Sequence, residues 1–247
     1  MTLEETKTST RVLLVSAIVL VVVLITGPLG YKLGMVPLQP SIFSLPIAAA
    51  GSLLVLIAGI VFMVMAVRAG RTQDRNQVGI AMVIALIPVA IVGPQIGAAT
   101  SVPPIHNIST DLDNPPEFVA ILPLRKEAPN GVSYGSEQMS ADDLAEQTRT
   151  SYPDLKPMMS SLGVAEAVSR SEAALLEMGL EIVSVNSDSG LVEATATTFW
   201  FGFKDDVVVR VTPADDGSRI DVRSMSRLGQ SDLGANAARI QTFFDTF

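Results

Sequence analysis

The residue types that could carry out chemistry are few in this chain. Cysteine is absent and His106 is the only histidine, so thiolate catalysis and zinc sites built on sulfur are excluded. The segment Gly131-Val-Ser-Tyr-Gly135 fits the Gly-x-Ser-x-Gly nucleophile motif, but that motif needs a preceding strand and a histidine later in the chain. His106, Asp111 and Asp113 are too few donors, in a proline-rich segment, to indicate a metal site. We therefore expect no catalytic residue, no metal and no cofactor.

Charged side chains on a predicted antiparallel sheet are the first candidates for binding. If residues 214–217 form a hairpin loop, Arg210 lies opposite Asp221, and Val211 lies opposite Ile220 on the other face. Arg223 follows on the polar face by alternation. This face is either solvated and laced with weak cross-strand ion pairs, or a charged ligand groove beneath the N-terminal loop.

Two more charged candidates, Arg227 and Asp232, precede the last predicted helix. Asp232 is expected to cap that helix, and Arg227 is expected to pair with Asp232 or with Asp206. Alternatively, a helix N-terminus beside arginines could hold an anion.

Aromatic residues gather at one point of the chain. Phe199, Trp200, Phe201 and Phe203 are consecutive or nearly so. Such a group either wraps the end of the sheet as core or forms an aromatic shelf, at the membrane interface or for an apolar ligand. The candidate ligand-binding residues are therefore Trp200, Arg210, Asp221, Arg223, Arg227 and Asp232.

The elements that must position these residues form an α+β pattern. Hydrophobic periodicity and turn clusters predict helices over residues 141–151, 164–178 and 233–247, and strands over residues 181–186, 191–201, 206–212 and 219–227. We expect a four-stranded antiparallel sheet with helices on one face.

The N-terminal part of the chain has a different composition. Residues 1–100 carry six basic and three acidic residues, whereas residues 101–247 carry eleven basic and twenty-two acidic ones. Apolar stretches predict three transmembrane helices, over residues 12–31, 45–67 and 78–99. The acidic C-terminal part repels phosphate, so a nucleic-acid partner is excluded. The lipid bilayer is the expected partner of the spans.

Basic residues near the spans predict the orientation. Lys7 and Arg11 precede the first span and three arginines lie between the second and third, whereas the first loop has only Lys32. This distribution indicates a cytoplasmic N-terminus. We expect a cytoplasmic arm (1–11), a three-span region (12–100), a proline-rich linker (101–116) and an extracytoplasmic α+β domain (117–247), in the inner membrane of a bacterium.

Several segments carry a family resemblance. They are Pro103-Pro-Ile-His-Asn-Ile-Ser-Thr-Asp111, Thr198-Phe-Trp-Phe-Gly-Phe-Lys-Asp-Asp206, Gly217-Ser-Arg-Ile-Asp-Val-Arg-Ser-Met-Ser-Arg227 and the run from Leu228 to Ile240. Over about residues 103–247 the chain resembles the bacterial domain-of-unknown-function 1499 (DUF1499) family. The resemblance implies a fold and no catalytic residue.

Three functional hypotheses follow. The first is an inner-membrane protein whose periplasmic domain binds a membrane or periplasmic protein, or an amphipathic small molecule, without chemistry. The second is a periplasmic hydrolase or lyase that uses carboxylates such as Asp205, Asp206 and Asp221 near Arg223. The third is a structural subunit that packs its spans against a larger membrane complex.

Overall fold

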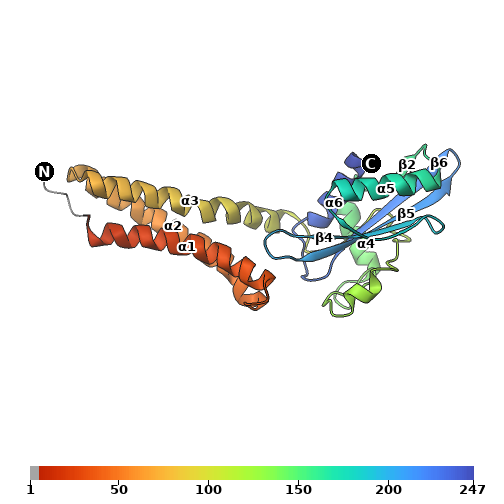
Figure 1. The fold of residues 1–247 in the computed structure, drawn as a ribbon, viewed down its shortest axis with the longest axis horizontal. Coiled ribbons are helices and arrows are strands. Elements are labelled where there is room, and N and C mark those ends of the chain that lie inside the picture. The colour runs from red at the N-terminus through yellow and green to blue at the C-terminus, as the bar shows by residue number, and fades with distance from the viewer. Residues whose placement is uncertain (1–5) are drawn as a thin grey trace. The chain divides into compact units, whose positions relative to one another are not determined.

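The computed structural model describes residues 6–247, and the chain divides into two compact units between Gly97 and Ala98. The first unit is helical and the second combines helices with a sheet (Figure 1).

The helical unit contains three long helices, α1 (Thr8–Lys32), α2 (Leu38–Arg68) and α3 (Thr72–Ser101). All three are long and apolar enough to cross a membrane, as predicted. Helix α2 begins seven residues before its predicted span because Pro40 lies in its first turn, where a missing N–H breaks no helical hydrogen bond. Residues 1–5 of the predicted N-terminal arm lie outside the described residues, and α1 begins at Thr8.

Small residues bring these helices together. Ala17, Ala81 and Ala85 are fully buried, and a Cβ atom added to Gly59 would lie 2.6 Å from Met82 Cγ. Large apolar side chains instead point outward, and Leu54 is 68% exposed. An apolar outer surface of this kind is suited to lipid.

The second unit contains a six-stranded antiparallel sheet, not the four-stranded sheet that the sequence predicted. The strands are β1 (Asn107–Ser109), β2 (Met158–Ser160), β3 (Glu181–Asn186), β4 (Leu191–Thr197), β5 (Lys204–Ala214) and β6 (Gly217–Ser226). Their order is β1-β6-β5-β4-β3, and β2 also pairs with β6. The additional strands are β1 and β2, and β1 lies inside the segment that was predicted to be a linker.

One face of the sheet is covered by the main core of this unit. Helices α4 (Ala141–Ser151), α5 (Val164–Glu177) and α6 (Ala235–Thr246) supply side chains to it. Val209, Val211 and Ile220 of the sheet belong to the same core.

The opposite face is covered as well, so the alternative of a solvated polar face is wrong. Residues 116–132, which we call the covering segment, lie there and include a 3-10 helix (Leu122–Arg125). Phe118 and Ile121 pack against Val208 of β5 and Met225 of β6 in a second, smaller core. The sheet is therefore enclosed between two layers, and its polar side chains are buried between them.

Candidate functional site

The predicted register of the β5–β6 hairpin is confirmed. Arg210 lies opposite Asp221, and Val211 lies opposite Ile220. The apolar pairs therefore occupy the main core and the charged pair occupies the other face, as alternation requires.

Arg210 and Asp221 belong to a ring of four charges. Arg210 Nη2 lies 2.9 Å from Oδ2 of both Asp221 and Asp111, and Arg219 Nη2 lies 2.9 Å from Asp111 Oδ2. The Asp221 side chain is 1% exposed and that of Arg210 is 19% exposed. Each cation of the ring contacts both carboxylates. The Arg210–Asp221 pair is therefore largely buried rather than on the surface, and it connects the β5–β6 hairpin to the segment that contains Asp111.

Arg227 pairs with Asp206 and not with Asp232. Its Nε and Nη2 atoms lie 2.8 Å from the two carboxylate oxygens of Asp206, so the contact is bidentate. Arg125 Nη1 donates to the same carboxylate at 2.6 Å, and the Thr195 hydroxyl donates at 2.7 Å. Burial raises the pKa of Asp206, but the hydrogen bonds from Arg227, Thr195 and Arg125 outweigh it and hold that pKa below its ordinary value. Asp206 is therefore a buried, ionised anchor.

Arg223 is buried without a carboxylate of the described residues at ion-pair distance. Its guanidinium donates to Asn107 Oδ1 at 2.9 Å and to the carbonyl oxygens of Pro116 and Val132. Its charge also lies 5.0 Å from the centre of the Phe118 ring. Burial lowers the pKa of Arg223 to about 10. The donors of Arg223 are thus used to hold the covering segment on the sheet.

The Glu193 carboxylate, on β4, also binds the covering segment. Val119, Ala120 and Ile121 donate their backbone N–H groups to it at 2.8–3.1 Å. Glu193 is 2% exposed. A buried carboxylate with this many donors is stabilised without a cationic partner.

Asp232 is not the N-cap residue of the last helix, because α6 begins at Ala235 and Gly234 occupies the N-cap position, but Asp232 does contact the start of the helix. Its carboxylate accepts hydrogen bonds from the backbone N–H groups of Gly234 and Asn236 at 2.7 and 3.0 Å. Arg239 of α6 in turn pairs with Asp205 at 2.7 Å. The start of α6 is therefore occupied by the chain's own carboxylate, which argues against an anion site there.

The charged residues that the sequence indicated are brought to one face but not into one open site. Asp205, Asp206 and Asp221 are all buried and each carries an ion pair. The partners Arg125 and Arg219 were missed. Local pattern gives no signal for Arg125, which is 81 residues from Asp206. Arg219 lies two residues before Asp221 on β6, so alternation could have placed it on the same face.

The aromatic residues do not continue β4, which ends at Thr197. They form a turn between β4 and β5 in which Phe199 is 79% exposed and Trp200 is 44% exposed. Of the two alternatives, the core is therefore wrong for these two rings, which pack edge to face with centroids 5.6 Å apart. The aromatic turn, residues 198–203, is therefore the candidate that remains on the surface.

The other two sequence candidates carry no site. The Gly131–Gly135 motif lies in a stretch, residues 126–140, without helix or strand, so it is not a nucleophile elbow. His106 Nδ1 lies 3.3 Å from the Gln230 carbonyl oxygen, and burial lowers its pKa. Asp111 is engaged in the ring of charges. Among residues 6–247 no group of three histidine or acidic side chains could hold a metal ion.

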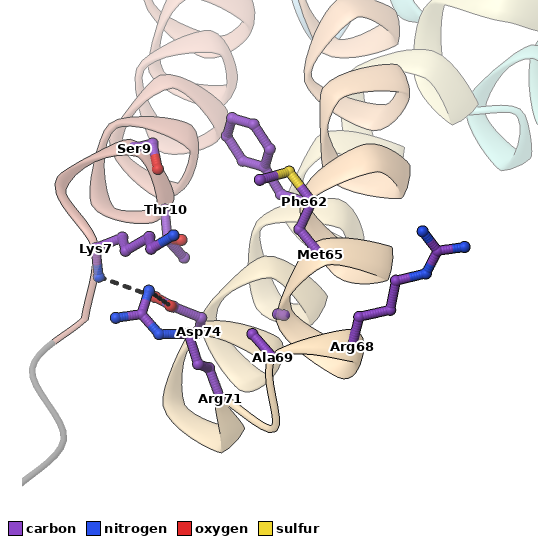
Figure 2. Close-up of a pocket in the computed structure, with 10 residues that line it drawn as sticks. Lys7, Ser9, Thr10, Phe62, Met65, Arg68, Ala69, Arg71 and Asp74 are labelled. Carbon is purple, nitrogen blue, oxygen red and sulfur yellow. Dashed lines mark hydrogen bonds and ion pairs between the residues drawn. The ribbon is translucent and has the colours of Figure 1, made fainter.

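A cleft in the helical unit lies where α1 begins and α2 ends (Figure 2). Asp74 is 4% exposed, and its Oδ1 atom accepts a hydrogen bond from the Lys7 backbone N–H at 3.0 Å. Its Oδ2 atom forms an ion pair with Arg71 Nη1, also at 3.0 Å. Arg68 extends away from this carboxylate (Figure 2). Asp74, in the first turn of α3, thus joins the N-terminal segment to Arg71 of the preceding loop, so these two basic segments lie at the same end of the helices.

Comparison with known families gives one match. A family model described as a protein of unknown function (DUF1499) matches residues 107–247, which include all six strands and helices α4 to α6. No curated protein and no solved structure matches the chain. Because the family model covers more than half of the chain, the protein belongs to the DUF1499 family.

Proposed function

We propose that the protein is a bacterial inner-membrane protein that presents its DUF1499 domain in the periplasm as a non-catalytic binding module. The proposed orientation rests on the basic residues. Lys7 and Arg71 contact the same buried carboxylate, Asp74, and therefore lie on one side of the membrane. At the other ends of α1 and α2, where α1 ends and α2 begins, Lys32 is the only basic residue. An excess of basic residues marks the cytoplasmic side.

The observation that favours binding over catalysis is the burial of the carboxylates. A general acid or base must come within hydrogen-bond reach of its substrate. Asp206 is fully buried beneath the segment around Phe118, and two arginines and a threonine occupy its oxygens. Asp221 is occupied in the same way by Arg210 and Arg219. The hydrolase or lyase hypothesis thus loses the groups on which it depended.

The small residues of α2 argue against the structural-subunit hypothesis. Ala48 and Ala49 are buried within this chain's own helices, Gly51 faces Leu20, and Gly59 faces Met82. These positions are the ones that would let a foreign helix approach closely. They are used internally instead.

The charged face therefore stabilises the fold, and the exposed side chains of the domain are the ones that can bind a partner. The buried ion pairs and the Glu193 contacts hold the covering segment to the sheet and make the domain rigid. Trp200, with its neighbour Phe199, is the candidate binding residue that remains accessible. The partner is a membrane or periplasmic protein, an amphipathic molecule or the lipid surface itself.

Reporter fusions test the location of the domain. Alkaline phosphatase, which is active only outside the cytoplasm, should be active when fused after Ala99 and inactive when fused after Arg71. Fusions of β-galactosidase at the same two positions provide the matched control and should show the opposite pattern. Active phosphatase after Arg71 with inactive phosphatase after Ala99 would overturn the periplasmic assignment.

A further inference from the structure

The aromatic turn, residues 198–203, is held in one conformation by its own hydrogen bonds. Thr198 N–H donates to the Phe203 carbonyl oxygen at 2.8 Å, and Gly202 N–H donates to the Thr198 carbonyl oxygen at 3.0 Å. The Thr198 hydroxyl accepts from Phe203 N–H at 2.8 Å. Gly202 has a φ of +69°, which glycine adopts without strain. The turn therefore presents the Phe199 and Trp200 rings at little further cost in conformational entropy.

The turn lies at the end of the sheet where the chain enters from the last span. Thr197 pairs with Lys204 at the base of the turn, Asp205 pairs with Ser226, and Asn107 pairs with Met225. The first residue of β1 is thus at the same end as the aromatic turn. The β5–β6 turn lies at the opposite end (Figure 1).

The connection from the last apolar helix to this end of the sheet is short. Helix α3 ends at Ser101 and β1 begins at Asn107. The five residues between them span about 20 Å at most when fully extended, at about 3.3–3.6 Å per residue. A span that lies in a bilayer therefore keeps this end of the domain close to the lipid surface.

Leu233 adds a third exposed apolar side chain at the same end, after Phe199 and Trp200. Its neighbour Asp232 donates its backbone N–H to the Ile105 carbonyl oxygen, just before β1. Leu233 is 38% exposed and has a φ of +55°, the left-handed region that residues with a Cβ seldom adopt. Such strain is retained mainly where it serves a function.

We propose that this end of the DUF1499 domain inserts the aromatic turn into the headgroup region of the same bilayer that holds the three helices. Tryptophan favours this region because its ring is apolar and its N–H can remain hydrated. Lys204, exposed directly after the turn, is suited to lipid phosphates. The inference deepens the proposed function by naming its partner; it requires the helices to span a bilayer and does not depend on which side the domain occupies.

Trp200 is the only tryptophan in the chain, so its fluorescence reports on this turn alone. The full-length protein is placed in nanodiscs of phosphatidylcholine and phosphatidylglycerol, with and without bromine on the upper acyl carbons. Bromolipids quench a ring only at very short range. We expect bromolipids to lower the fluorescence emission of Trp200 strongly. We also expect acrylamide, dissolved in the aqueous phase, to quench Trp200 less in nanodiscs than in detergent-free urea, where the domain is unfolded.

The matched control moves the tryptophan to the far end of the sheet. Met159 is 65% exposed on β2, next to the β5–β6 turn. The double variant M159W/W200F should show no bromolipid quenching, while near-identical circular dichroism shows that the fold is kept. Equal quenching at both positions, or none at Trp200, overturns the proposal. A blue-shifted Trp200 without bromolipid quenching also overturns it and assigns the turn to a protein contact. The alkaline phosphatase fusions are unaffected by any of these outcomes, so they test the proposed function separately.

Discussion

Asp206 shows how a charged residue can be a structural anchor rather than a reactive group. Its carboxylate is fully buried and receives hydrogen bonds from Arg125, Arg227 and Thr195. Burying charges costs free energy, and good geometry with every lone pair satisfied offsets that cost. Removing one partner is therefore more harmful than the net value of the pair suggests.

The change of Asp206 to Asn should lower the free energy of unfolding of the domain by about 3–5 kcal/mol, because two buried arginines then lose their anion. The measurement is peroxide oxidation of Met225, which is 1% exposed, as a function of urea in the full-length protein. Met159, 65% exposed, is oxidised in every sample and serves as the internal reference. The control variant is D215N, in the exposed β5–β6 turn. A loss no larger than that of D215N would mean that the buried ion pair contributes nothing.

The same carboxylate predicts how stability depends on acid. The pKa of Asp206 is below its ordinary value of 3.8 in the folded state. Its contribution to stability is therefore complete above that ordinary value and is lost as the pH falls through the lower, folded value. We expect the urea midpoint of wild-type Met225 oxidation to fall more steeply below about pH 4 than that of D206N. Parallel pH curves for the two proteins would contradict the lowered pKa.

At the scale of elements, the covering segment is attached to the sheet by hydrogen bonds from its backbone to side chains of the strands. Glu193 of β4 accepts the N–H groups of Val119, Ala120 and Ile121. Arg223 of β6 donates to carbonyl oxygens of Pro116 and Val132. One anion and one cation thus hold a segment with little regular structure.

The change of Glu193 to Gln should release this segment while the strands stay folded. Hydrogen bonds to a charged group contribute about 1.5–3 kcal/mol, which corresponds to about a tenfold to hundredfold faster opening. Amide hydrogen exchange of the full-length protein should accelerate by that factor at residues 119–121, with β5 unchanged. E181Q, in the exposed first residue of β3, is the control. Acceleration along the whole sheet would show instead that the segment and the sheet unfold together.

Most elements could be predicted because their signals are local. Periodicity and turn clusters place α4 and β3 at their observed bounds and the other long strands within a few residues. Strands β1 and β2 have three residues each, too few for alternation to be visible.

The buried state of the charged face could not be predicted for a related reason. Alternating charged residues normally indicate a solvated face. The residues that cover this face are distant in sequence, since Glu193 and Ile121 are 72 positions apart. The Arg210–Asp221 pairing was predictable because a hairpin sets its own register.

At the scale of the whole molecule, the two units have separate cores. The buried residues of the helical unit end at Val92, whereas those of the DUF1499 domain begin at Ile105. Their functions are correspondingly distinct in our proposal: the helices hold the protein in the membrane, and the domain provides the binding surface.

Residues 98–247 produced alone should therefore fold with the stability that they have in the full-length protein. The reason is that both cores of the domain and all of its buried ion pairs lie within this segment. Urea-dependent oxidation of Met225 should give the same midpoint for the isolated domain and for the full chain in nanodiscs. The F199S/W200S variant of the isolated domain controls for self-association through the aromatic turn, because it removes the exposed rings and leaves both cores intact. A lower midpoint that this variant does not restore would mean that the helical unit contributes to the fold, and the two units would then have to be treated as one.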